Sequence, residues 1–508
     1  MTPRSRVVRL VLAAMLLTAT ASTAGAAPAL ASEGAVDGPA GDTQDLGVLL
    51  DRAEPGQRVV IPPGTYRGPV VIDVPVVLEP RGDVEVVGDG TGTVLTVRAP
   101  GTVVRGITVR GSGPGPTGNP AAIRVEADEV TIEGVRVEDS YIGIAVEEVG
   151  SVRLVDNTIV GRAGAAIVDE GHAVEHDRGD DDPAAGTIGE DAEGTGHRAR
   201  GDGIWLHDVE HVLVRGNTIT SSRDGVYVSF GSDTLIDGNE IRDSRYAVHT
   251  MFTRQLTLVE NRFVDNLSGA VLMYRGPALV LRNHIEGSRS PSTGFALLLK
   301  DVVGVEAVEN VLVRNRVGLH LDGPTGDDPA KLSRNTIAHN AIGVAAYSSA
   351  RATFRGNSFV DNQIQVLPQG GRLTGLTWSD QGIGNLWSTY RGFEGLAAGR
   401  GAVPHIEGGA VDRLLGRNPE LLVLADTPAL RMLRSVEERW GRQDPILTDE
   451  LPITSPLSPP VPAVASPDGS SAAVALGLAL LVPPVLLLLL ARRSVRRPSR
   501  RSLRASPA

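Results

Sequence analysis

The sequence predicts an all-β protein whose body is a right-handed parallel β-helix, a solenoid in which each coil adds one strand to each of several parallel sheets. An Asn-containing motif recurs every 22 residues in the middle of the chain, and the apolar runs beside it alternate with period two. The chain has 60 Gly and 33 Pro among 508 residues and only 4% aromatic residues, which favours short strands joined by tight turns. A leucine-rich horseshoe is the nearest alternative, but its fixed leucine framework is absent.

The composition excludes several classes of function. The chain has no Cys, which rules out a disulfide scaffold, a thiolate metal site and a cysteine nucleophile. Its formal net charge of -11 argues against nucleic acid as a partner, because phosphate binding needs a basic surface. A hydrophobic content of 41% indicates that the body folds.

The first segments along the chain predict export and a capped N-terminal end. Residues 1–31 resemble a signal peptide, since three early Arg precede an apolar run and a small-x-small site at Ala29 to Ala31. An uncleaved anchor is the alternative. Residues 42–58 are predicted to form an N-terminal cap, in which Asp42 to Ala53 is a short amphipathic helix over the hydrophobic end of the solenoid.

Residues 59–370 are predicted to form the β-helix, with coils of about 22 residues. Asn217, Asn239, Asn261 and Asn283 are spaced by 22 residues, and the pattern continues less evenly to Asn357. Asn tolerates a left-handed backbone and its amide bonds to copies above and below, so we expect one stacked column at a coil corner. This column is interpreted as structural.

A second set of aligned segments predicts which side chains face outward. The segments begin GIWLHD at residue 203, GVYVSF at 225, AVHTMF at 247, GAVLMY at 269, ALLLKD at 296 and GLHLDG at 318. In each segment, the residues one and three positions after its first residue are predicted to fill the core. Alternation then turns the residues two and four positions after it outward: Trp205, Tyr227, His249, Val271, Leu298, His320, His207, Ser229, Met251, Met273, Lys300 and Asp322.

This face carries a candidate copper site. Met251 and Met273 are 22 residues apart and are expected to lie one coil from each other, with His249 two residues from Met251 on the same strand face. Thioether and imidazole ligands suit a transiently bound Cu(I) better than Zn, Mg or Ca. The alternative is a surface that contacts a partner protein or packs under a loop. The predicted partner surface contains Trp205, His207, Tyr227, Lys300 and His320.

Residues 170–200 are predicted to be an acidic, His-containing loop inserted into the β-helix. The segment contains His172, His176 and His197 among many acids. Two His four residues apart share a metal on a helix, but the Gly and Pro content opposes a stable helix. We therefore interpret the segment as a solvated loop.

The C-terminal segments predict a cap, a stalk and a membrane anchor. Residues 371–450 contain Trp378 and Trp387, and a helical stretch is expected from 409 to 441. Residues 451–471 form a Pro- and Ser-rich linker. The uncharged segment 472–491 is long enough for a single transmembrane helix, and seven Arg in the basic tail 492–508 place that tail in the cytoplasm and the body outside it.

The segments from 201 to 323, followed by GNLWSTYRGF, resemble the periplasmic NosD family, the β-helical accessory proteins of nitrous oxide reductase maturation. The resemblance covers most of residues 45–440. It implies a non-enzymatic factor that works with an ABC-type permease and ATPase, a copper chaperone and nitrous oxide reductase. The family often has an Asp-rich, calcium-loop-like stretch after its Trp-Ser-x-Tyr motif, but residues 395–405 here read GLAAGRGAVPH, which puts calcium binding in doubt.

Two other classes of function remain open at the level of sequence. Polysaccharide lyases, hydrolases and epimerases use a similar repeat, and they need carboxylates grouped on one outward face. Asp202, Asp224 and Asp243 recur near corners, where turn capping is the simpler interpretation, and no compact Asp/His/Arg cluster is evident. A rod used only for adhesion is the third class, and the His and Met side chains of the outward face argue against it.

Overall fold

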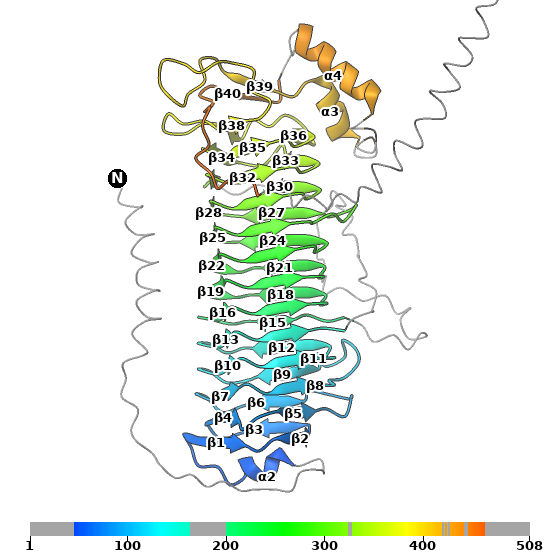
Figure 1. Ribbon diagram of the computed structural model, residues 1–508, viewed down its shortest axis with the longest axis vertical. Helices are drawn as coiled ribbons and strands as arrows, with labels where there is room; N and C mark the ends of the chain where they lie inside the picture. Colours follow the sequence, from blue (N-terminus) through cyan, green and yellow to red (C-terminus); the bar gives the residue numbers. More distant parts are fainter. Residues whose placement is uncertain are drawn as a thin grey trace, which may run out of the picture.

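The body of the chain is a parallel β-helix, as predicted (Figure 1). The structure, a computed structural model, describes residues 45–162, 200–323, 328–418, 421, 424, 427–440 and 445–462. The predicted signal peptide, nearly all of the acidic loop, the transmembrane segment and the basic tail therefore lie outside the described residues. The coils wind in the right-handed sense, and each except the last contributes one strand to each of three parallel sheets.

The first sheet has 13 strands, which lie in this order: β1 (Gln57–Ile61), β4 (Val76–Pro80), β7 (Val103–Arg105), β10 (Thr131–Glu133), β13 (Arg153–Val155), β16 (Leu213–Arg215), β19 (Ser232–Asp237), β22 (Arg254–Val259), β25 (Ala278–Leu281), β28 (Val305–Val308), β31 (Ala330–Ser333), β34 (Ala352–Arg355) and β37 (Leu376–Thr377).

The second sheet also has 13 strands: β2 (Gly64–Arg67), β5 (Val84–Val87), β8 (Thr108–Arg110), β11 (Arg136–Glu138), β14 (Thr158–Val160), β17 (Thr218–Thr220), β20 (Glu240–Arg242), β23 (Arg262–Val264), β26 (His284–Glu286), β29 (Val311–Val313), β32 (Thr336–Ala338), β35 (Ser358–Val360) and β38 (Leu386–Trp387).

The third sheet has 12 strands and carries the candidate site: β3 (Val70–Ile72), β6 (Leu95–Val97), β9 (Ala121–Val125), β12 (Ile142–Glu147), β15 (Ile204–His207), β18 (Asp224–Ser229), β21 (Tyr246–Met251), β24 (Ser268–Arg275), β27 (Phe295–Val302), β30 (Val317–Asp322), β33 (Ile342–Tyr347) and β36 (Ile364–Gln369).

The core is one continuous column of aliphatic side chains between the three sheets. Alternation within each short strand sends one set of residues inward, as in β15, where Ile204 and Leu206 are fully buried while Trp205 and His207 are not. The predicted stack of Asn is present. Asn239, for example, accepts hydrogen bonds from the backbone N–H and the side-chain amide of Asn217, and it donates to Asn261 and to the Val214 carbonyl.

The left-handed backbone at this corner belongs to the residue before each Asn, so the prediction that the Asn adopts it is wrong. Gly216, Gly238 and Glu260 have φ of 64°, 62° and 55°, whereas the Asn that follow them are absent from the positive-φ residues. Inward-pointing Asn side chains accept the buried backbone N–H groups of the preceding coil, which requires ordinary φ at Asn and a tight turn one residue earlier. A second, unpredicted ladder runs through Asn315, Asn340 and Asn362.

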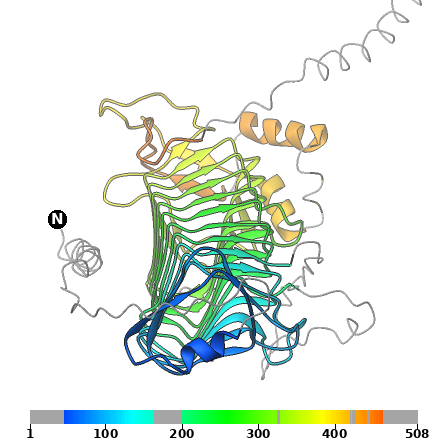
Figure 2. The same cartoon turned by 60° about the horizontal axis from the view of Figure 1, so that its bottom comes forward.

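Both ends of the core are covered. At the N-terminal end, α2 (Leu46–Leu50) lies across the first coil (Figure 2) and buries Leu46 and Leu50, and its N-cap Asp45 accepts a hydrogen bond from the Gly47 N–H at 2.8 Å. This helix is shorter than the predicted one. At the other end, Trp378 stacks on Phe354 and Trp387 stacks on Phe359.

The C-terminal segment adds two helices and a small sheet. These are α3 (Ala410–Arg417), α4 (Pro428–Trp440) and an antiparallel pair of β39 (His405–Glu407) and β40 (Leu447–Asp449). Val411 and Leu415 of α3 pack against the outer face of the third sheet at Ala345 and Leu367. Within the described residues, no helix has the length and apolar character needed to cross a membrane.

Candidate functional site

The outer face of the third sheet holds the predicted site residues in two adjacent columns. Strand register aligns the first column, which contains Trp205, Tyr227, His249, Val271, Leu298 and His320. The second column contains His207, Ser229, Met251, Met273, Lys300 and Asp322. The predicted direction of these side chains, away from the core, agrees with the register.

His249 is held in place by a buried carboxylate. Its Nδ1 donates to Oδ2 of Asp224 at 3.0 Å, because a carboxylate can only accept, and the rings of Tyr227 and Tyr246 each lie 5.1 Å from the imidazole centroid to centroid. The side chain of His249 is 12% exposed. A carboxylate that accepts a hydrogen bond from one ring nitrogen is the usual arrangement around a metal-binding His, and it leaves the lone pair of Nε2 free to bind a metal.

Asp224 is fully buried and doubly paired with Arg245. Arg245 Nε and Nη2 contact the two carboxylate oxygens at 2.9 Å each, and the guanidinium carbon lies 4.6 Å from the centre of the Tyr246 ring. Burial alone would raise the pKa of Asp224, but the charge of Arg245 and the hydrogen bond from His249 hold this pKa well below its ordinary value. Asp224 is therefore a fixed negative charge beneath His249.

The same ion pair occurs one coil earlier, between Asp202 and Arg223. Arg223 Nε and Nη2 contact the carboxylate at 3.0 Å and 2.7 Å, and Asp202 Oδ1 also accepts the backbone N–H of Asp224 at 3.2 Å. The sequence showed no compact Asp/His/Arg cluster, whereas Asp224, Arg245 and His249 form one in the structure. Turn capping is also an incomplete interpretation of Asp202 and Asp224, because each carboxylate neutralises an Arg located 21 residues further along the chain.

Met251 and Met273 occupy neighbouring coils, as their spacing predicts. They are directly paired between β21 and β24, and both side chains are half-buried. The hydroxyl of Tyr227 donates to Sδ of Met251 at 3.6 Å, and Met273 packs on Tyr246, Val271 and Leu298. Two thioethers and an oriented imidazole therefore lie on one small area of the sheet, and this donor set fits a soft monovalent metal.

The other residues of the predicted partner surface differ in their exposure. Trp205 stacks on His207 at 5.4 Å between centroids, His207 Nδ1 is 2.7 Å from Ser229 Oγ, and Lys300 lies 3.5 Å from Asp322. Trp205, His207, Tyr227 and Lys300 are half-buried. His320, in contrast, is only 5% exposed and lies against Phe295 at 4.5 Å between centroids. It contributes almost no surface to a partner.

Three aromatic residues at the end of the same strands were missed from the sequence. Phe230, Phe252 and Tyr274 stack in consecutive coils, with centroid separations of 5.2 Å and 5.0 Å. They are the sixth and last residues of GVYVSF, AVHTMF and GAVLMY, one position after the last predicted outward position, so the aromatic that recurs there was the available signal.

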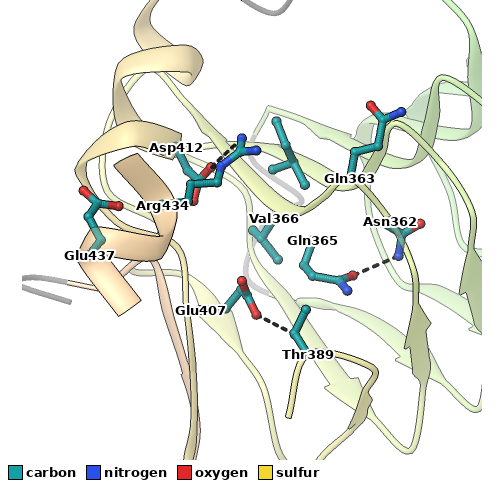
Figure 3. Close-up of a pocket in the computed structure, with 10 residues that line it drawn as sticks. Asn362, Gln363, Gln365, Val366, Thr389, Glu407, Asp412, Arg434 and Glu437 are labelled. Carbon is teal, nitrogen blue, oxygen red and sulfur yellow. Dashed lines mark hydrogen bonds and ion pairs between the residues drawn. The ribbon is translucent and has the colours of Figure 1, made fainter. Parts of the chain in front are cut away.

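A polar cavity of about 120 Å³ lies between the last coils and the C-terminal helices (Figure 3). Asp412 of α3 faces Arg434 of α4, and their Oδ1 and Nη2 atoms are 3.0 Å apart. Glu437 accepts the backbone N–H of Ala410 at 2.9 Å, at the start of α3. Burial raises the pKa of Asp412. These contacts hold the two helices together on the end of the solenoid, so we interpret the cavity as structural.

Metal ligation by harder ligands finds no support in the described part of the chain. There, no group of three or more His, Asp or Glu side chains is arranged to hold a metal ion. The acidic loop with His172, His176 and His197 lies outside those residues. The thioether pair with His249 is thus the candidate that the geometry supplies.

The family model and the two relatives that match this chain share the name NosD. Residues 186–392 match the family model described as "Periplasmic copper-binding protein (NosD)". A protein of Pseudomonas aeruginosa named "Probable ABC transporter binding protein NosD" is 32% identical over 431 residues, which cover 78% of this chain and 90% of the relative. A protein of the same name from Stutzerimonas stutzeri is 28% identical and covers 78% and 86% of the two chains.

Among solved structures, the catalytic domain of a GH87 alpha-1,3-glucanase in complex with tetrasaccharides superposes with a TM-score of 0.51. The two chains are 11% identical, and the match covers 71% of each. This likeness shows the shared β-helical fold alone.

Proposed function

Because this chain belongs to the NosD family of periplasmic proteins, we propose that it is a non-enzymatic accessory protein in assembling the copper site of nitrous oxide reductase. It works outside the cytoplasm with an ABC-type permease and ATPase and with a copper chaperone. The names of its relatives support association with a transporter. The observation that carries the copper role is the position of His249, oriented by Asp224 beside Met251 and Met273.

The chemistry proposed for the site is reversible binding of Cu(I) as cargo. Nε2 of His249 and the two thioethers would supply three soft ligands on a rigid sheet, and the buried carboxylate of Asp224 fixes the orientation of the imidazole through its hydrogen bond with Nδ1. Three ligands leave a position open for the donor or acceptor protein, which favours transfer over storage. The carboxylates beneath the face are paired with Arg and turned away from solvent, so we do not propose a carbohydrate-active site.

Titration with Cu(I) against a competing chromogenic chelator tests this site in the purified full-length chain. We expect the Met251→Leu/Met273→Leu double variant to bind Cu(I) at least about 10- to 100-fold more weakly, because both soft ligands are lost while volume is preserved. Met432→Leu is the matched control, since this Met is 69% exposed on α4 and remote from the site in sequence. Equal affinity of the double variant and the parent would refute the site and favour a surface used only for partner contact.

We also propose that residues 472–491 form a single transmembrane helix that holds the body on the outer side of the cell membrane. The segment is uncharged and seven Arg follow it. Protease added to intact spheroplasts should digest an epitope inserted near residue 300 and spare one placed after residue 508. Protection of the first epitope, or loss of the chain from the membrane on alkaline washing, would contradict this topology.

A further inference from the structure

The corner at the end of the third sheet has the same unusual backbone in every coil of the site. The residue after each second-column position takes a positive φ: 55° at Glu148, 50° at Asp208, 54° at Phe230, 54° at Phe252, 56° at Tyr274, 50° at Asp301 and 86° at Gly323. Gly and Asp tolerate this region, whereas a bulky aromatic side chain there is a costly exception. Three consecutive aromatics at this corner thus oppose local preference, which indicates a role other than forming the turn.

The geometry of the three rings decides what they can bind. Phe230 and Phe252 are inclined by 11° and Phe252 and Tyr274 by 18°, so the rings cover one another's faces and leave their edges outward. Phe230 is 53% exposed, and the His207 ring lies 5.8 Å from it, edge-on. A sugar ring packs on an exposed aromatic face, which this stack largely covers. Ring edges carry partial positive charge and suit carboxylate oxygens and apolar side chains.

Two Arg lie beside the stack, and the acids that share its corner position, Asp208 and Asp301, lie one coil beyond its two ends. Arg254 lies two residues after Phe252, and Arg275 directly follows Tyr274. Both side chains are exposed, and neither has an ion pair or a side-chain hydrogen bond to a described residue. Met251 and Met273, adjacent on the sheet, supply adaptable apolar contact area. Solvated cations at the edge of an exposed apolar patch favour a partner with carboxylates around an apolar centre.

We propose that Phe230, Phe252 and Tyr274, with Arg254 and Arg275, form a docking surface for a protein partner that presents an apolar segment flanked by carboxylates. The proposal deepens the proposed function by giving the chemistry of one partner, and it does not require that copper bind the chain. Docking over this stack would also cover the half-buried Met pair, which lies one residue before the stack in two of the three coils.

Photo-crosslinking in cells that produce the full-length chain tests the surface. With p-benzoylphenylalanine in place of Tyr274, we expect a crosslink to another protein, mapped by mass spectrometry to a segment that contains apolar residues and Asp or Glu. The same substitution at Val60, which is 48% exposed on β1 of a different sheet, should give no such product. A crosslink to lipid, to glycan or to a second copy of this chain, or none above the Val60 control, would overturn the proposal.

Reversing the charge of Arg254 and Arg275 is a second test of the docking surface. Arg254→Glu/Arg275→Glu should lower the crosslink yield by about tenfold or more, through repulsion of the partner's carboxylates. Arg262→Glu, an exposed Arg on the second sheet, should leave the yield unchanged. An unchanged yield in the double variant would refute the acidic chemistry of the partner. If the chain with benzoylphenylalanine at position 274 and no other change gives no crosslink above the Val60 control but binds Cu(I), only the docking surface is refuted. A crosslinked protein unrelated to a transporter or to copper refutes the proposed function.

Discussion

Replacing Asn239 with Ala is expected to destabilise the solenoid by about 3 to 5 kcal/mol. The side chain takes part in four hydrogen bonds: it accepts from the backbone and side-chain amides of Asn217 and donates to Val214 and Asn261. All of these groups lie in the buried corner, so the truncation leaves the Asn217 backbone N–H without its acceptor and away from water. Urea denaturation of the purified chain measures the loss.

The matched control for this variant is Thr218→Ala. Thr218 lies directly after Asn217 in β17, but its side chain is exposed on the outer face, so its truncation should change stability by less than about 0.5 kcal/mol. Because each coil contacts mainly its neighbours, hydrogen exchange at the Asn217 amide should accelerate more than exchange in distant coils. Equal midpoints for Asn239→Ala and Thr218→Ala would mean that the ladder is incidental to stability.

The Asn ladder also illustrates how far the sequence reaches. A 22-residue period and alternating apolar positions determine the register of neighbouring coils, and this register placed Met251 beside Met273 correctly. The period is equally compatible with a left-handed Asn or a left-handed residue before it. Gly at 216 and 238 was the signal that separates the two, since Gly takes positive φ most readily.

The parts of the site that escaped prediction have physical reasons. Alternation applies within a strand, so it says nothing about Phe230 and Phe252, which lie in the turn after it. The Asp224–Arg245 pair joins adjacent coils, and its spacing of 21 differs from the repeat by one residue. His320 was placed correctly on the outer face, but its burial was not predicted, because alternation does not show how closely Phe295 and Tyr347 of the neighbouring coils pack on it.

His320 is expected to make the fold sensitive to acid. Burial lowers the pKa of His320 to about 4, and the nearby positive charges of Arg316 and Lys300 act in the same direction against the opposing charge of Asp322. Its Nδ1 is buried with no hydrogen-bond partner among the described residues, and its ring centroid lies 4.5 Å from that of Phe295 and 5.9 Å from that of Tyr347. The folded chain therefore holds a neutral, buried imidazole beside two aromatic rings.

The sign of the pH dependence follows from the direction of this pKa change. In the unfolded chain the imidazole takes up a proton below about pH 6.5, whereas in the folded chain it does so only near pH 4, so acid favours the unfolded state between these values. A pKa lowered from about 6.5 to about 4 corresponds to about 3 kcal/mol of stability, present above pH 6.5 and lost on acidification to pH 4.

His320→Leu should remove this loss, because Leu carries no proton and suits the neighbouring Phe295 and Leu298. We expect the variant to match the parent near pH 7 and to be more stable by about 2 to 3 kcal/mol at pH 4.5, measured as the difference in urea midpoints at each pH. His211→Leu is the control, since its side chain is 58% exposed. Carboxylates that titrate in the same range affect all three proteins alike, so only the difference reports on His320. If His320→Leu and the parent lose stability in parallel from pH 7 to 4.5, the imidazole is not the acid-sensitive group.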